Sequence, residues 1–400
     1  MRKILILSIM VLISVSFFNC EEDVESPYDT SGQLPAVTII RPADNDSFTW
    51  GDTILFEGEG ENYEGIDLDD SMMVWRSDRD DTIGTGTVFE RGDLSVNVHN
   101  ITLTGTDRRG RINSDDIIIE VAAWPEPEEY ELITVSASSG YQMGWSGIDA
   151  GEEPVHTVSL SGFLVGKNEV PYSLWADIKA WAELNGYSFG NEGSRGYGSS
   201  PTDQDPVTYI SWADCIAWCN AYSERLGLTP VYYTDSGKAS LYKDSSEDAD
   251  IDNNCVNWSA DGFRLLTEAE WEYSARYING TDISSGAHHS GYDLHTAVDD
   301  CAWYINNSGS STHPVGQLLP NSLGAKDMSG NVWEWCWDWY GSYTDLFQDN
   351  PRGPESGYNR VIRGGCCLST AEYCRTAVRD LHDPDYPDAC LGFRVCRGNI

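Results

Sequence analysis

Hydrophobic and polar residues alternate along residues 35–122 in short runs such as PAVTII, DTILFEG and DIIIEVA. Turns rich in Gly, Asp and Asn separate these runs. A period of two is typical of strands with one buried face, and regularly spaced runs of this kind are typical of β-sandwiches. The pattern therefore predicts an all-β sandwich over residues 35–122, with Trp75 as the core aromatic residue between its two sheets.

From residue 132 to the C-terminus the pattern changes, and three stretches carry apolar residues at helical spacing. They begin at Val170, Ser211 and Thr267, and Glu270 would complete a capping box with Thr267. Elsewhere, dense glycines and aromatic residues predict short strands and loops, so residues 132–400 should form an α+β body of low regular content. The Pro- and Glu-rich residues 123–131 are predicted to be a linker.

The N-terminus has two cations, an apolar run from Ile4 to Phe18, and then Cys20. The run is too short for an ordinary membrane span and predicts a secretory signal over residues 1–20. Because it ends on a cysteine, it resembles a bacterial lipoprotein signal with Cys20 as the lipidated residue. A signal cleaved nearby without lipidation is the alternative. The acidic residues 21–34 are predicted to be a tether. We expect a lipoprotein of the bacterial cell envelope, anchored in a membrane at the outer membrane or cell surface.

Acidic residues outnumber basic ones by 64 to 25, which gives a formal net charge of −39. The chain has no block of Lys and Arg that could neutralise phosphates, so we expect no nucleic-acid partner. An acidic surface favours solubility, and it also suits divalent cations. The aromatic content of 12% indicates folded domains rather than a disordered chain.

Residues 132–400 contain, in this order, YQMGW, EEPVHTVSLSGFLVGKNEVPYSLW, GFRLLTEAEWEYSAR, SGNVWEW, RVIRGG and CLGFRVCR. This series resembles the formylglycine-generating enzyme family, also called the sulfatase-modifying factor family. The resemblance implies an irregular α+β FGE-sulfatase domain, related to C-type-lectin-like folds and often stabilised by calcium. The stretches VWRSDRDDTIGTG and HNITLTGTDRRG, in turn, resemble the PKD/Ig-like sandwich domains of secreted bacterial proteins, which are spacers or adhesion modules.

Catalytic members of this family, as the resemblance implies, oxidise a sulfatase cysteine to formylglycine at Cu(I) held by two thiolates spaced C-x4-C. Matched residue by residue, Ser369 takes the first thiolate position and Cys374 the second, while Cys366 replaces a serine. A serine hydroxyl is a hard, neutral ligand that does not suit Cu(I), so the usual copper chemistry is not expected. The alternative is a rebuilt copper site in which Cys366 or Cys367 pairs with Cys374.

Ten cysteines remain when Cys20 is set aside, and an even number in an exported protein fits complete disulfide pairing. The resemblance implies that Cys219 pairs near the C-terminus, where Cys396 is the nearest candidate. Cys336 with Cys374 is a second candidate pair. A disulfide at Cys374 would leave no copper site.

The segment from Ser329 to Glu334 combines a glycine turn with oxygen donors, which is what calcium needs. The resemblance implies a calcium site here, with Ser329, Gly330, Val332 and Glu334 as the ligand residues. The alternative is that Glu334 only caps the turn or pairs with an arginine.

Two functions remain open. The first is a non-catalytic binding protein or envelope-complex component, with a groove lined by Trp333, Trp335 and Arg363 that would take a protein or glycan ligand. The second is a formylglycine-generating oxidase acting on a sulfatase-type protein. The incomplete thiolate pair at Ser369 favours the first.

Overall fold

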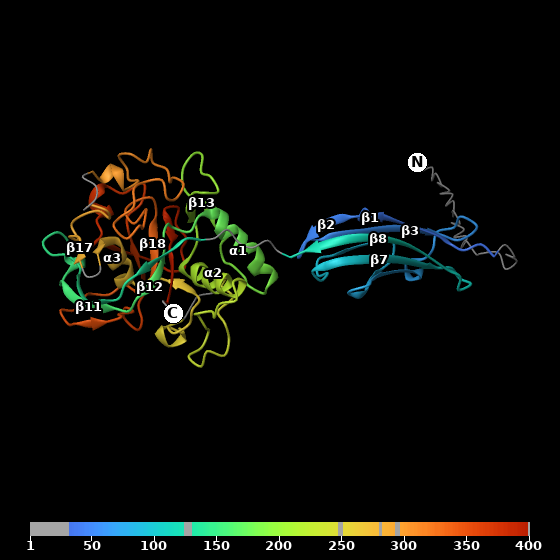
Figure 1. Ribbon diagram of the computed structural model, residues 1–400, viewed down its shortest axis with the longest axis horizontal. Helices are drawn as coiled ribbons and strands as arrows, with labels where there is room; N and C mark the ends of the chain where they lie inside the picture. Colours follow the sequence, from blue (N-terminus) through green and yellow to red (C-terminus); the bar gives the residue numbers. More distant parts are fainter. Residues whose placement is uncertain (1–31, 124–129, 247–250, 280–281, 293–296, 399–400) are drawn as a thin grey trace, which may run out of the picture. The chain divides into compact units, whose positions relative to one another are not determined.

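The computed structural model describes residues 32–123, 130–246, 251–279, 282–292 and 297–398, and the chain divides into two compact units, Met1–Pro125 and Glu126–Ile400 (Figure 1). The predicted signal, Cys20, nearly all of the tether and most of the linker lie outside the described residues. Within the described residues, no helix has the length and apolar character needed to cross a membrane.

The first unit consists of two β-sheets. One has the strand order β1-β3-β6, and the other has the order β2-β8-β7-β4-β5, in which β2 runs parallel to β8. The strands are β1 (Ala36–Arg41), β2 (Asp46–Thr49), β3 (Ile54–Glu61), β4 (Met73–Ser77), β5 (Asp81–Thr85), β6 (Val88–Arg91), β7 (Asn97–Thr106) and β8 (Ile112–Ala122).

One hydrophobic cluster takes side chains from both sheets of this unit. Trp75, on β4, is fully buried in it and donates its indole N–H to the Gly86 carbonyl at 2.9 Å. Phe56 stacks on Phe89 with ring centroids 4.9 Å apart and meets Trp75 edge-on. The predicted strands and the core role of Trp75 are confirmed, whereas the assignment to PKD/Ig-like sandwiches stays a prediction.

The second unit has three main sheets, with the strand orders β10-β11-β19, β15-β23-β12-β9 and β21-β20-β18-β22. Two short pairs, β13-β14 and β16-β17, complete it. The strands are β9 (Leu132–Val135), β10 (Ser138–Met143), β11 (His156–Leu160), β12 (Phe163–Gly166), β13 (Ser194–Arg195), β14 (Val207–Thr208), β15 (Phe263–Leu265), β16 (Tyr277–Asn279), β17 (Asp282–Ile283), β18 (Trp333–Trp339), β19 (Gln348–Asp349), β20 (Arg360–Arg363), β21 (Arg379–His382), β22 (Leu391–Phe393) and β23 (Val395–Gly398).

Three α-helices form where the sequence predicts them: α1 (Tyr172–Leu184), α2 (Trp212–Arg225) and α3 (Glu268–Arg276). Capping boxes open α2, through Ser211 and Asp214, and α3, through Thr267 and Glu270. These local hydrogen bonds fix the first turn of each helix. The irregular α+β body expected from the sequence is therefore confirmed (Figure 1).

Strand β18 separates the two large hydrophobic clusters of this unit. Trp335 and Trp337 face the cluster around α1 and α2, whereas Cys336 faces the cluster around α3. The alternation follows from the period of two along a strand.

Helix α3 lies in the core and carries three buried carboxylates, and each of them is paired with an arginine from a different strand. Glu268 binds Arg379 of β21 at 2.6 Å, Glu270 binds Arg264 of β15 at 2.7 Å, and Glu272 binds Arg363 of β20. Buried charges need such partners, because the loss of water would otherwise be uncompensated.

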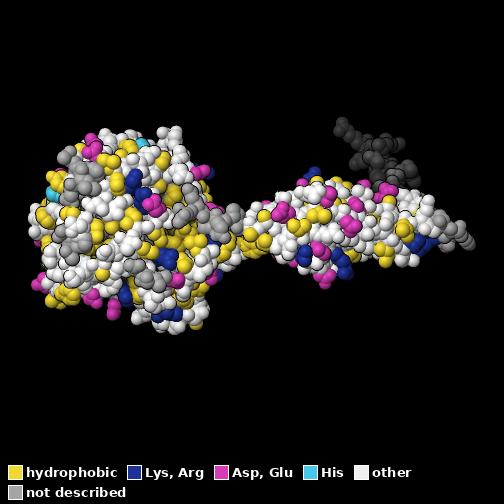
Figure 2. Space-filling model, in the orientation of Figure 1, with side chains coloured by type: hydrophobic (Ala, Val, Ile, Leu, Met, Phe, Trp, Pro, Cys, Tyr) yellow, Lys and Arg dark blue, Asp and Glu magenta, His cyan; other side chains and the backbone are white. Residues whose placement is uncertain are grey.

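Figure 2 shows Asp and Glu side chains dispersed over the drawn faces of both units, with Lys and Arg scattered among them. This dispersion agrees with an acidic surface that serves solubility.

Candidate functional site

The glycine-led loop from Gly364 to Cys374 follows β20 and ends in the 3₁₀ helix η5 (Ala371–Cys374). Gly364 and Gly365 have φ angles of +98° and +74°, which favour glycine. A Cβ on Gly365 would lie 2.8 Å from the Cys374 Sγ, so the turn brings the backbone against that thiol. The loop therefore needs its glycines in order to close on Cys374.

Ser369, at the position of the first copper thiolate, binds within its own loop. Its hydroxyl accepts the Cys366 N–H at 3.0 Å and donates to the Cys366 Sγ at 3.5 Å. The residue is thus used to hold Cys366, and it supplies no soft ligand for Cu(I).

Cys374 lies in an apolar cluster with Ala302 and Tyr304 and is fully buried. Burial raises the pKa of its thiol well above the usual range, with the neighbouring Cys366, Cys301 and Cys367 adding to the effect. A raised pKa favours the thiol over the thiolate, and the thiolate is the form that binds metals and attacks. Because Ser369 stands where a thiolate is needed, the copper site expected of a catalytic member does not fit these residues.

Cys366, Cys367 and Cys390 form a group that we call the thiol cluster, packed with Tyr197 and Trp333. Hydrogen bonds from Cys367 and then Cys390 lower the pKa of Cys366 to about 3. The sequence predicts no separate role for Cys390. Its position directly before LGFR could have indicated that it lies near the other thiols, because that segment forms β22 and pairs with β18.

The predicted ligand groove is wrong for two of its three residues. Trp335 and Arg363 are both 0% exposed, and Trp333 alone is partly exposed. Trp335 is packed in the hydrophobic cluster around α1 and α2, and Arg363 is held by Glu272 and by main-chain carbonyls. Neither side chain can contact a ligand at the surface.

The Ser329 and Glu334 side chains of the predicted calcium site have other partners, and Val332 is bound through its N–H. The Ser329 hydroxyl donates to the Cys374 carbonyl at 2.8 Å, and the Val332 N–H donates to Glu169 at 3.2 Å. Glu334 is paired with Arg394 at 2.7 Å and accepts the Trp271 indole N–H at 2.7 Å. The alternative in which Glu334 pairs with an arginine is therefore what the structure shows.

A second carboxylate beside this loop was missed by the sequence reasoning. Asp327 accepts the Gly316 N–H through Oδ2, whereas its buried Oδ1 has no hydrogen-bond partner. Burial raises the pKa of Asp327, and burial together with Asp327 and Glu334 raises that of Glu169. Across the described ranges, no three His, Cys, Asp or Glu side chains are arranged to hold a metal ion. The Ser329 and Glu334 side chains are thus engaged elsewhere, and Asp327 Oδ1 is a buried carboxylate oxygen with spare capacity.

The ten described cysteines are all free thiols in the structure. Cys219 lies near enough to Cys396 to affect its pKa, which burial raises well above the usual range. Cys336 and Cys374 belong to different hydrophobic clusters. Both disulfide pairings stay predictions for the oxidised protein.

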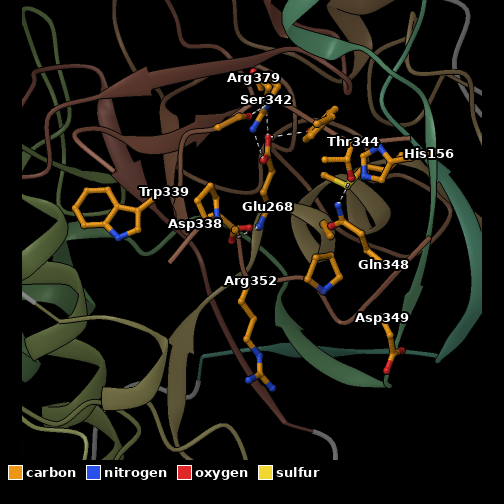
Figure 3. A pocket seen from close by; sticks show the side chains of 17 residues that line it. His156, Glu268, Asp338, Trp339, Ser342, Thr344, Gln348, Asp349, Arg352 and Arg379 are labelled. Carbon is orange, nitrogen blue, oxygen red and sulfur yellow. Dashed lines mark hydrogen bonds and ion pairs between the residues drawn. The ribbon is translucent and has the colours of Figure 1, made fainter. Parts of the chain in front are cut away.

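A cavity of about 500 Å³ opens beside the N-terminus of α3, between β18 and the residues that follow it (Figure 3). Asp338 lies at its wall and accepts the Glu268 N–H at 2.8 Å. Burial, with Glu268 nearby, raises the pKa of Asp338 to about 8. The volume of the cavity is that of an ordinary small-ligand pocket, and the cavity wall includes His156 and Arg352.

The capped helices, the irregular sheets and the glycine-led loop that closes on Cys374 fit a domain of the sulfatase-modifying factor class. Residues 123–399 match the family model of the sulfatase-modifying factor enzyme 1-like domain, and the chain belongs to that family.

Relatives with established names fall into different functional classes. The chain is 31% identical to the chaperone protein LppX of Paenibacillus barcinonensis over 60% of this chain and 81% of that one. It is 29% identical to the formylglycine-generating enzyme of Thermomonospora curvata over 67% and 94%. Among solved structures, Treponema denticola variable protein 1 superposes with a TM-score of 0.55 at 32% identity, covering 68% of this chain and 96% of that one.

Proposed function

We propose that this chain is a non-catalytic binding protein or envelope-complex component, exported and anchored to a membrane through a lipid on Cys20. The observation that supports it is Ser369, which replaces a copper thiolate and binds Cys366 instead. A site with one cysteine and one serine lacks the pair of soft ligands that suits Cu(I).

The ligand site of this function is not the predicted groove, because Trp335 and Arg363 are buried. The cavity beside α3 is the better candidate for a segment of a protein or for a glycan (Figure 3). The first unit would serve as a PKD/Ig-like spacer between the lipid and this domain. The name of the relative LppX, a chaperone, supports protein binding as a role within the family.

Calcium is a proposal for the loop next to Asp327. The buried Oδ1 of Asp327, without a hydrogen-bond partner, would be the carboxylate oxygen offered to the ion, and bound calcium would hold the loop in place. Calcium should then raise the melting temperature of the wild-type chain and leave that of an Asp327→Asn variant unchanged. Equal effects on both chains would count against this site.

The test of the proposed function is Cu(I) titration of the reduced full chain, combined with an assay of cysteine oxidation in a sulfatase-type peptide. We expect no stoichiometric Cu(I) binding and no aldehyde product. The matched variant Ser369→Cys restores the C-x4-C pair and should bind Cu(I). Tight Cu(I) binding and turnover by the unaltered chain would overturn the proposal.

The second candidate function, a formylglycine-generating oxidase, has one observation in its favour. Cys366 and Cys367 lie in the same glycine-led loop as Cys374 and both add to the rise in its pKa that burial causes, so a rebuilt site would take its second thiolate from one of them. In that case Cys366→Ser and Cys374→Ser would each abolish Cu(I) binding. The name of the Thermomonospora curvata relative supports this candidate.

A further inference from the structure

Two chain segments form the thiol cluster. Each is hydrogen-bonded through the main chain to residues 331–333, just before and at the start of β18. The Cys367 N–H donates to the Asn331 carbonyl at 2.8 Å, and the Trp333 N–H donates to the Cys390 carbonyl at 2.8 Å. Residues 366–367 and residue 390 are therefore held against one another by the main chain. Their meeting does not depend on flexible side chains.

Cys366 is the centre of the cluster. It packs with Cys367 and Cys390, and its sulfur receives the Ser369 hydroxyl at 3.5 Å. A hydroxyl donor of this kind supports a sulfur that attacks as a thiolate. Ser369 therefore has a positive role in the loop, in addition to removing a copper ligand.

Geometry limits which of the three sulfurs can bond. Consecutive Cα atoms are about 3.8 Å apart, whereas a disulfide normally joins Cα atoms about 4.4–6.8 Å apart, so Cys366 and Cys367 do not suit each other. Cys390 is then one partner. Cys366 and Cys390 are 5% and 6% exposed and Cys367 is 0% exposed, so of the three residues only the first two have any exposed surface.

We propose that Cys366 and Cys390 are a reversible thiol–disulfide exchange pair whose substrates are small external disulfides and thiols. The Cys366 thiolate attacks one sulfur of the external disulfide, and a mixed disulfide forms as the first external thiol leaves with a proton. The Cys390 thiolate then attacks Cys366, and the second external thiol leaves. Two protein thiols are oxidised, and one external disulfide is reduced to two thiols.

Exchange at this pair is independent of the ligand-binding function proposed above, and it uses a partner, Cys390, that the family's copper pair does not include. Oxidation would tie the loop after β20 to the start of β22. Cys367 would stay a buried thiol beside the new bond. An exported protein meets the external disulfides that this chemistry requires.

The experiment equilibrates the full chain in buffers of reduced and oxidised glutathione, traps free thiols by alkylation in acid-quenched denaturant, and maps the cross-linked peptides by fragmentation. We expect a Cys366–Cys390 linkage that forms and reverses with the glutathione ratio, while Cys367 is alkylated. A folded chain that forms no such linkage at any ratio overturns the proposal. So does a linkage of Cys366 to Cys374, or of Cys367 to Cys390.

Two variants keep the test interpretable. Cys390→Ser should lose the linkage, whereas Cys255→Ser, at another buried cysteine, should retain it. Ser369→Ala keeps all three thiols and should slow the first exchange roughly three- to tenfold, the effect of one lost hydrogen bond. An unchanged rate removes the role of Ser369 from the proposal. Cu(I) binding by the reduced chain would refute the proposed function and leave this linkage to be judged by itself.

Discussion

Replacing Glu334 by glutamine tests whether this residue serves an ion pair or a calcium ion. Glu334 and Arg394 are both 0% exposed and lie 2.7 Å apart. Glutamine keeps the shape of the side chain and can still accept the Trp271 indole N–H, so the change removes a charge and little else. Arg394 would then be a buried cation without its carboxylate.

The expected loss in the free energy of unfolding depends on the hydrogen bonds that Arg394 keeps in the variant. Removing one partner of a buried pair costs about 3–5 kcal/mol. Arg394 also donates to the carbonyls of Gly166 at 2.9 Å and Lys326 at 2.8 Å, which remain in the variant. We therefore expect the lower end, a loss of about 3 kcal/mol in the free energy of unfolding. For a unit of this size, that loss lowers the melting temperature by about 6–12 °C.

The assay is calorimetric unfolding of the full chain, with calcium and with a chelator. The loss caused by Glu334→Gln should be the same in both solutions, because the partner is Arg394. The matched control is Glu372→Gln at an exposed position, which should change stability by less than about 0.5 kcal/mol. A loss below about 1 kcal/mol, or one that disappears in the chelator, would refute the reasoning and return Glu334 to the calcium site.

Three further changes have expected outcomes. Gly330→Ala should destabilise by more than about 1 kcal/mol in thermal unfolding, because φ is +79° and the new Cβ would lie 2.1 Å from the Trp303 carbonyl oxygen; Gly186→Ala, at φ +81° with open space, is the control and should cost less. Ser211→Ala should cost about 1 kcal/mol in denaturant unfolding, because the cap of α2 is lost, and an unchanged midpoint would contradict the capping role. Burial and then Glu268 raise the pKa of Asp338 in the folded state from 3.8 to about 8. Between these two pH values the folded chain therefore holds a proton on Asp338 that the unfolded chain has lost. The contribution of Asp338 to the free energy of unfolding thus falls as the pH rises from about 4 to about 8. Asp338→Asn should flatten this fall, and an identical pH profile would show that Asp338 does not cause it.

The helices and the first sheets could be predicted because their signals are local. Ser211 and Thr267 mark helix starts through hydrogen bonds that reach only three residues along the chain. The alternation around Trp75 likewise depends on neighbouring residues in one strand. Such patterns are complete within a short window of sequence.

The candidate site could be predicted only in part, because its contacts join distant segments. The match of Ser369 to a copper position came from the family resemblance and stays a prediction, and its bond to Cys366 depends on the fold of the loop. Arg363 was expected at a surface groove, but it is buried and paired with Glu272 of α3, which is distant in sequence. The meeting of Cys390 with the other thiols needs the pairing of β18 with β22. None of these partners follows from local periodicity.

The three buried carboxylates of α3 have a consequence for the order in which the second unit assembles. Their arginine partners come from β15, β20 and β21, strands that belong to two different sheets. A purely apolar helix could dock early and shift by one turn, because hydrophobic packing is not directional and would stabilise either position. Helix α3 meets all three of these arginines in one orientation only, and it can pair with all of them only when both sheets are in place. The helix should therefore dock late in folding and, once docked, fix how the two sheets face each other.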